Sequence, residues 1–255
     1  MQNSNALPAK IQNYVEAVIR LAETRNREIV SVLIFGSVNK AGFSQSVSDV
    51  DLIVALADDV PRKTKQVISR RLAELEIEHN LRELPGALRE TVYMKFDEAA
   101  GQFKSYFVCC KRDLLAGNAA AVFDVHPLAE SLLISAHIPF ANIVKSAKVI
   151  WGENFLDRIH IPALSKTHFA KNCASFLLLN AFAAAAYPFL PNATKYSMSI
   201  LKWMLHGCYF CYKLKSASIE DEIAFFDSKL DTGKIFSQLL ALRGEYQPSF
   251  GFIIN

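Results

Sequence analysis

The stretch from Val32 to Leu56 constrains the fold of this 255-residue chain more than any other part of it. Two short apolar runs, Val32–Phe35 and Val50–Leu56, flank a polar loop. The loop begins with a Gly-Ser pair and ends with Ser-Asp-Val-Asp, so two aspartates lie at the start of an apolar run. Aspartate is disfavoured in strands, and a local conflict of this kind tends to mark a functional site. The pattern therefore predicts strand, loop and strand, with the loop at a site.

The segments around this stretch predict a small sheet with helices packed against it. Apolar residues at three- and four-residue spacing predict a helix from Pro8 to about Arg25. Acidic residues and Pro61 mark the beginning of a second helix that extends to about His79. Two further strands are expected at Thr91–Phe96 and Phe103–Cys110.

Beyond Pro162 the chain changes to long helical segments, at about 164–187, 194–215 and 219–243. Their apolar residues lie on more than one face, which predicts a bundle of helices buried against one another. The expected fold class is therefore α/β (α+β). We expect a small mixed-sheet domain over residues 1–150 and an α-helical bundle domain over residues 151–255.

Composition is that of an ordinary soluble protein, with 51% hydrophobic and 21% charged residues and a formal charge of +3. No dense Lys/Arg run is present, so nucleic acid is not an expected partner. The N-terminus has no secretory signal pattern, and five cysteines, an odd number, suggest free thiols in a reducing cytoplasm. The Ala-rich stretch Cys173–Leu190 is near the lower length limit for a membrane span, and we expect a buried helix there and no membrane partner.

The polar loop has residue types that suit phosphate and metal chemistry. Side chains alternate along a strand, so Asp49 and Asp51 are expected to project from the same face. Paired carboxylates suit Mg²⁺ or Mn²⁺, and paired cations can hold the attacking and leaving oxygens of a nucleotidyl displacement. Gly36 lets the backbone approach a phosphate, and the Ser37 hydroxyl and nearby amides can donate to its oxygens. Lys40 adds a cation close by in sequence.

Together, in this order and at this spacing, these residues resemble the signature of the polymerase-beta-type nucleotidyltransferase superfamily. That signature is an apolar strand, Gly-Ser or Gly-Gly, a loop of about ten residues, and Asp-hydrophobic-Asp in a second strand. Many bacterial members read Gly-Ser-x-Ala-Arg-Gly and then Ser-Asp-x-Asp-Leu. This chain keeps the Gly-Ser pair and Ser48 to Leu52, but has Asn39, Lys40 and Ala41 in place of Ala, Arg and Gly. Lysine keeps the positive charge but lacks the bidentate fork of arginine.

The resemblance implies a Mg²⁺-dependent transfer of a nucleoside monophosphate from an NTP, with ATP the expected donor, to an acceptor hydroxyl. Pyrophosphate is released. It also implies roles for the loop residues: Asp49 and Asp51 as metal ligands, and Gly36, Ser37, Lys40 and Ser48 as phosphate-binding residues.

Such enzymes usually need a third carboxylate on the next strand, as metal ligand or base. Glu90 is the first choice, because Glu90-Thr91-Val92 is similar to the Glu-Val-Thr of the aminoglycoside-modifying branch. Asp97 and Glu98, at the far end of the expected strand, remain alternatives.

The two-domain layout also resembles the aminoglycoside and related antibiotic nucleotidyltransferases, in which a helical bundle follows the catalytic domain. The segment Lys148–Gly152 is similar to a hydrophobic-Gly segment at their domain junction. The acceptor would be an antibiotic-like small molecule or a protein, with Lys195, Tyr196 and Lys202 as candidate contacts. The alternative is a catalytically weak or inactive nucleotide-binding module of regulatory or antitoxin-like type. The sequence leaves the acceptor, the base preference and the oligomeric state open.

Overall fold

The computed structural model describes residues 8–39, 50–81, 105–126, 130, 135–189, 193–230 and 234–254. These residues form two compact units. The sheet unit contains residues 8–39, 50–81, 105–126 and 146–162, and the helical unit contains 130, 135–145 and the described residues from 163 onward. The domain boundary between 150 and 151 stays a prediction.

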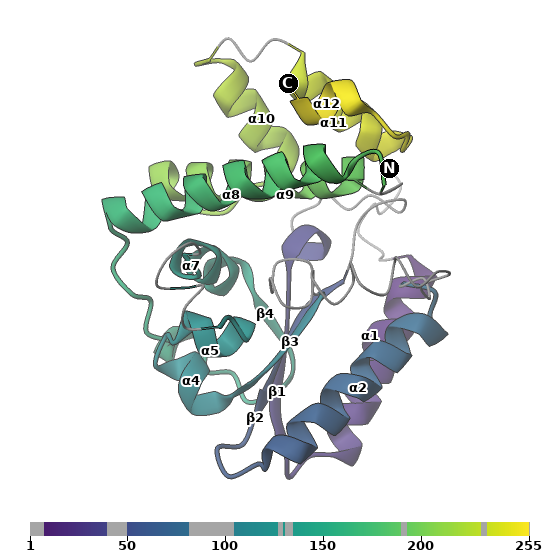
Figure 1. Cartoon of the computed structure of the whole chain (residues 1–255). Helices are drawn as coiled ribbons and strands as arrows, with labels where there is room; N and C mark the ends of the chain where they lie inside the picture. The colour runs from purple at the N-terminus through teal and green to yellow at the C-terminus, as the bar shows by residue number, and fades with distance from the viewer. Residues whose placement is uncertain are drawn as a thin grey trace, which may run out of the picture. The chain divides into compact units, whose positions relative to one another are not determined.

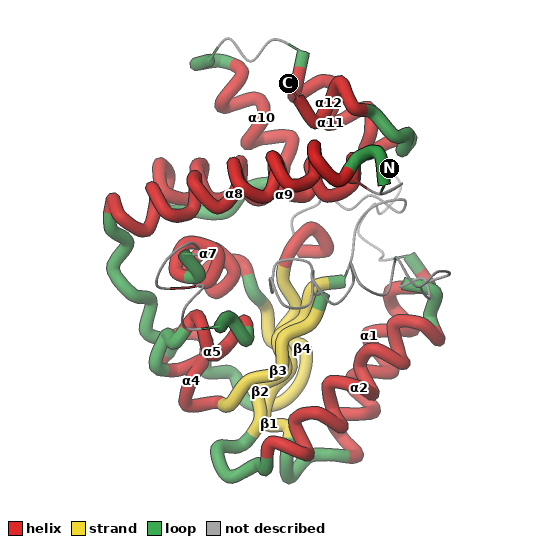
Figure 2. The backbone as a smooth tube through the Cα atoms, in the orientation of Figure 1, coloured by secondary structure: helices red, strands yellow, loops and turns green. Residues whose placement is uncertain are grey.

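The sheet has four strands in the order β3-β2-β1-β4. Figure 2 draws these strands in yellow, with the helices of the same unit in red around them. β1 (Ile29–Phe35) pairs antiparallel with β2 (Asp51–Leu56) and with β4 (Lys148–Gly152). β2 pairs parallel with β3 (Tyr106–Cys110), which makes the sheet mixed, as predicted. The two central strands are buried along nearly their whole length, and this explains why their sequences are continuous apolar runs without alternation.

Helices cover both faces of the sheet. α1 (Ala9–Thr24) and α2 (Arg62–Glu78) lie on one face, and the short helices α4 (Lys111–Leu115) and α5 (Ala119–Phe123) lie on the other (Figure 1). α1 and α2 each begin directly after a proline, which is tolerated there because first-turn amides have no partner inside the helix. Both lie close to the predicted ranges. Two 3-10 turns, η1 (Gly36–Asn39) and η2 (Leu156–Arg158), follow β1 and β4.

The helical unit is built from α7 (His137–Ser146), α8 (Lys166–Ala186), α9 (Ala193–Lys213), α10 (Ile219–Asp227), α11 (Ile235–Gly244) and α12 (Phe250–Ile254). Ser165 begins α8 with a capping box, and Ser218 caps α10 by accepting from the amide of Asp221 at 3.1 Å. The core of this unit joins four helices through Met198, Leu205, Ile219, Ile223, Phe236, Leu239, Leu242 and Phe252. The predicted combination of a mixed sheet and a helical bundle is confirmed.

Three predicted elements differ from the structure or lie outside it. The helix expected over 219–243 is two helices, because the chain turns at residues 228–230, just before an Asp-Thr-Gly sequence that favours turns. The segment Lys148–Gly152, expected as a junction, is the edge strand β4. The strand expected at Thr91–Phe96 lies outside the described residues.

α8 does not have the burial expected of it. Leu177, Leu178 and Phe182 are 67%, 56% and 44% exposed. Only 28% of the most apolar window of the helix is buried, with a mean hydropathy of 1.3. By length and composition alone, α8 is long and apolar enough to cross a membrane. This is weak evidence for a membrane span, because core helices of soluble proteins pass the same test. The expectation of a buried helix was wrong for this apolar face.

Candidate active site

The pairing of β1 with β2 brings the glycine of the predicted motif against one of its aspartates. Phe35 pairs with Asp51 at the end of β1, and Gly36 follows directly. Gly36 has φ +77°, a backbone conformation that side chains rarely adopt. A Cβ atom added there would lie 2.0 Å from Oδ2 of Asp51. The glycine is required at this position for two reasons, its backbone angle and the carboxylate beside its α-carbon.

The chain turns sharply after Gly36. The 3-10 turn η1 begins at this glycine and contains Ser37, whose side chain lies outside the described part of the structure. Asp51 is the first residue of β2 and is half-buried. The structure therefore places a partly accessible carboxylate next to a strand-to-turn backbone, the arrangement expected for a phosphate and cation site.

Several predicted site residues lie outside the described residues: Lys40, Ser48, Asp49 and Glu90, together with the alternatives Asp97 and Glu98. Their predicted roles, including the shared face of the two motif aspartates, stay predictions. Of the predicted set, the structure brings together Gly36 and Asp51.

The residues that are described fit a cation only in part. Within the described part of the chain, no group of three or more His, Cys, Asp and Glu side chains is arranged to hold a metal ion. The Asp51 carboxylate supplies a hard oxygen donor of the kind that Mg²⁺ prefers. A Cβ built on Gly36 would lie 2.0 Å from its Oδ2, so the carboxylate lies against the bare α-carbon of the glycine. Asp51 therefore suits the predicted role, and two of the three expected ligands, Asp49 and Glu90, lie outside the described residues.

A buried polar cluster lies in the same part of the sheet unit and was not predicted. Glu76 of α2 is 3% exposed, and Tyr14 of α1 is fully buried. The Ser105 hydroxyl donates a hydrogen bond to Glu76 Oε1. Burial raises the pKa of Tyr14, and the nearby charges of Glu76 and Asp51 raise it further, so both carboxylates lie within electrostatic range of the phenol.

One sequence signal could have found the buried glutamate. Ile68, Leu72 and Glu76 follow one another at four-residue spacing, so all three lie on one face of α2. The first two are buried core residues, and a glutamate that continues such a stripe is a polar group at a core position.

In the helical unit, the candidate acceptor contacts lie on α9. Lys195 is exposed, and its Nζ lies 4.9 Å from the ring centroid of Tyr246. Lys202 and Tyr196 are half-buried. A substrate role for these residues stays a prediction.

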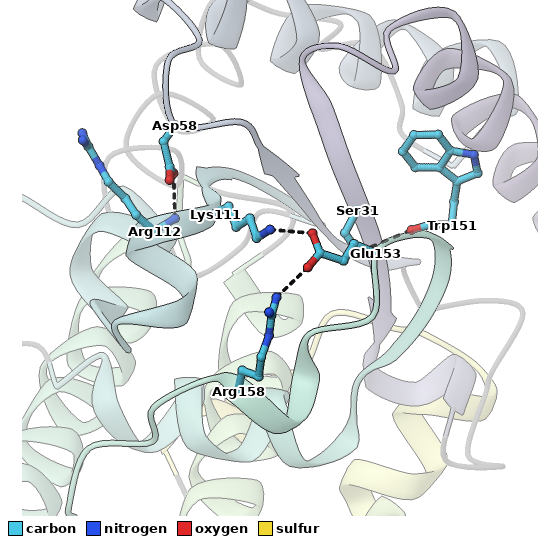
Figure 3. A network of polar contacts seen from close by, with 7 residues as sticks. All are labelled: Ser31, Asp58, Lys111, Arg112, Trp151, Glu153 and Arg158. Carbon is cyan, nitrogen blue, oxygen red and sulfur yellow. Dashed lines mark hydrogen bonds and ion pairs between the residues drawn. The ribbon is translucent and has the colours of Figure 1, made fainter.

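A network of ion pairs lies at the other end of the sheet (Figure 3). Glu153 accepts from Lys111 at 2.5 Å and from Arg158 at 2.6 Å, and its amide donates to Val30 at 2.9 Å. The hydrogen bond from Lys111 lowers the pKa of Glu153 most strongly. Four residues of β1 separate Ser31, which pairs at this end, from the glycine of the site, so the five residue steps between them span about 17 Å. This network connects β4 to its neighbours and lies too far away to take part in the site.

Comparison with known proteins places this geometry in a known fold. No family model and no curated protein matches the sequence. Among solved structures, the crystal structure of spectinomycin adenyltransferase AAD(9) from Enterococcus faecialis with ATP and spectinomycin is similar, with a TM-score of 0.54. The match covers 96% of this chain and 92% of that chain, at 11% sequence identity. This chain has the fold of that adenyltransferase. The fold expected from the nucleotidyltransferase-like motif is therefore confirmed.

Proposed function

We propose that this protein is a metal-dependent nucleotidyltransferase that moves a nucleoside monophosphate from an NTP, with ATP as the expected donor, to a hydroxyl of a small-molecule acceptor. The observation that supports this most directly is the Asp51 carboxylate held against the bare α-carbon of Gly36. The motif, the mixed sheet and the likeness to an adenyltransferase solved with ATP and spectinomycin support it as well.

In the proposed reaction, an acceptor hydroxyl oxygen forms a bond to the α-phosphorus of the NTP. The bond from that phosphorus to the bridging oxygen of the β-phosphate breaks, and pyrophosphate leaves. The hydroxyl proton passes to a carboxylate base, for which Glu90 is the candidate. A bound Mg²⁺ would supply neutralisation of charge on the phosphate oxygens.

The residues of the chain have distinct tasks in this scheme. Asp51, with Asp49, would hold the cation. The backbone after Gly36 would approach the triphosphate without a side chain in between, and Ser37, Lys40 and Ser48 would add donors and positive charge. We infer a cytoplasmic location from the cysteines, all five of which are free thiols.

The test is label transfer with pure protein, Mg²⁺ and each α-labelled NTP, with spectinomycin, aminoglycosides and lincosamides as acceptors. We expect transfer to one acceptor class and its loss in Asp51→Ala and Asp49→Ala. Transfer that persists in the double variant would overturn the metal-site assignment. Nucleotide binding without transfer to any acceptor would favour the regulatory, antitoxin-like alternative.

A further inference from the structure

The buried carboxylate of Glu76 is connected to the backbone that carries Asp51. The Ser105 hydroxyl donates to Glu76 Oε1, and the Ser105 carbonyl accepts from the Leu52 amide at 2.7 Å. Leu52 follows Asp51 directly and pairs with Tyr106 at the first rung of the parallel β2–β3 ladder. Two hydrogen bonds therefore connect a helix carboxylate to the peptide unit between Asp51 and Leu52.

This connection lies where the parallel pairing of β2 with β3 begins. Asp51 is the first residue of β2 and pairs with Phe35 of β1, one residue before the pairing of β2 with β3 begins at Leu52. Ser105 comes directly before β3. A serine fixed on both its hydroxyl and its carbonyl would hold the two strand beginnings in one register.

The burial of Glu76 is hard to explain by a contribution to stability alone. Glu76 is 3% exposed, whereas Glu74 and Glu78 on the same helix are exposed and pair with Arg71 at 3.1 and 2.6 Å. Removing a carboxylate from water is unfavourable, and an apolar residue of similar size at such a position often gives an equally stable or more stable protein. A buried carboxylate that accepts a hydrogen bond next to a site is typical of groups that orient the residues binding a metal.

We propose that Glu76 is a positioning residue for Asp51, which acts through Ser105 to fix the beginning of β2. Its task is to hold the motif carboxylate where it binds the divalent cation of the nucleotidyl transfer. This inference rests on the proposed function.

The experiment measures Mn²⁺ binding to the full-length protein by electron paramagnetic resonance, and kcat and KM in the transfer assay. Glu76→Ala and Ser105→Ala should each weaken Mn²⁺ binding or lower kcat by about 10- to 100-fold, with little change in KM for the acceptor. Ser105→Ala keeps the carbonyl that accepts from Leu52 and removes only the hydroxyl. The two effects should be non-additive in the double variant, because both break one connection. Glu76→Gln should restore binding, because its Oε1 still accepts from the serine.

Two control variants on the same helix separate positioning from stability. Leu72→Ala truncates a fully buried neighbour on the same face and should lower the melting temperature without changing the Mn²⁺ affinity. Glu74→Ala removes an exposed carboxylate and should change neither. A Glu76→Ala protein with wild-type Mn²⁺ affinity and kcat but a lower melting temperature would overturn the inference. So would a Gln variant as impaired as the Ala variant.

The outcomes distinguish this inference from the proposed function. Wild-type protein that binds Mn²⁺ but transfers no nucleotide would overturn the function, and the Mn²⁺ affinities of the variants would still decide the role of Glu76. Transfer and Mn²⁺ affinity that are both unaffected by Glu76→Ala would leave the function standing and overturn the positioning role. Wild-type protein that binds no Mn²⁺ would overturn both.

Discussion

Substitution of Gly36 by alanine tests the geometry of the site most directly. Alanine at φ +77° costs about 1–2 kcal/mol in backbone strain, of which about 0.4–1 kcal/mol is regained from the less flexible unfolded chain. The net loss of about 1 kcal/mol corresponds to a melting temperature lower by about 2–4 °C for a chain of this length. The protein should therefore still fold.

The effect on activity should be larger than the effect on stability. The new Cβ would lie 2.0 Å from Oδ2 of Asp51, and real contacts of this kind stay beyond 3.0 Å, so the carboxylate must move by about 1 Å. A displacement of that size at a reacting centre can lower the rate about 100-fold, or about 2.7 kcal/mol in activation free energy. Because the collision is with the end of a side chain, the Asp51 side chain will rotate away, and the proposed cation site will be lost before the fold is.

The assay is nucleotide transfer together with thermal unfolding of Gly36→Ala. Gly251→Ala is the matched control, because Gly251 lies in helix α12 with open space around its α-carbon. This substitution should raise the free energy of unfolding by about 0.5–1 kcal/mol. If the effect acts through Asp51, Gly36→Ala should cause no further loss of activity in an Asp51→Ala background. A folded Gly36→Ala protein with activity close to wild type would show that activity does not depend on the position of the Asp51 carboxylate beside residue 36.

Three other substitutions or treatments test features outside the site. Gly152→Ala should destabilise the protein more than Gly36→Ala, because at φ +83° its Cβ would lie 2.3 Å from the backbone oxygen of Val30, which cannot rotate away; thermal unfolding measures the difference. Glu153→Gln should lower the melting temperature at pH 7, because hydrogen bonds from Lys111 and Arg158 lower the pKa of Glu153 and stabilise the folded protein. The wild type loses this stabilisation as pH falls through the lowered pKa. The difference in melting temperature between wild type and variant should therefore vanish in acid. Burial raises the pKa of the Cys109 and Cys208 thiols to about 12, so iodoacetamide at pH 8 should leave both unmodified in native protein and label them after unfolding, as mass spectrometry would show.

The β1–η1–β2 unit was predictable because each of its parts has a strong local signal. Both strands are buried on both faces, so their sequences are unbroken apolar runs, and Gly36 marks the end of the first. The edge strand β4 was not recognised, because its residues are half-buried or exposed and only pairing with β1 makes the segment a strand. The break between α10 and α11 was not predicted, because apolar residues continue at helical spacing on both sides of it.

Glu76 shows where local pattern stops being informative. Glu74, Glu76 and Glu78 alternate along α2 in a charged sequence, and nothing in their chemistry separates them. The helical period distinguishes them, because residues two positions apart lie about 200° apart around the helix axis. When Glu76 is buried, Glu74 and Glu78 therefore lie on the exposed side. Period and the burial of Leu72 thus suffice to place this carboxylate inside. Its partner is Ser105, 29 residues further along the chain, and only the tertiary structure brings that hydroxyl to it. The burial of Glu76 can therefore be predicted from the sequence, whereas its hydrogen bond with Ser105 is found only in the folded structure.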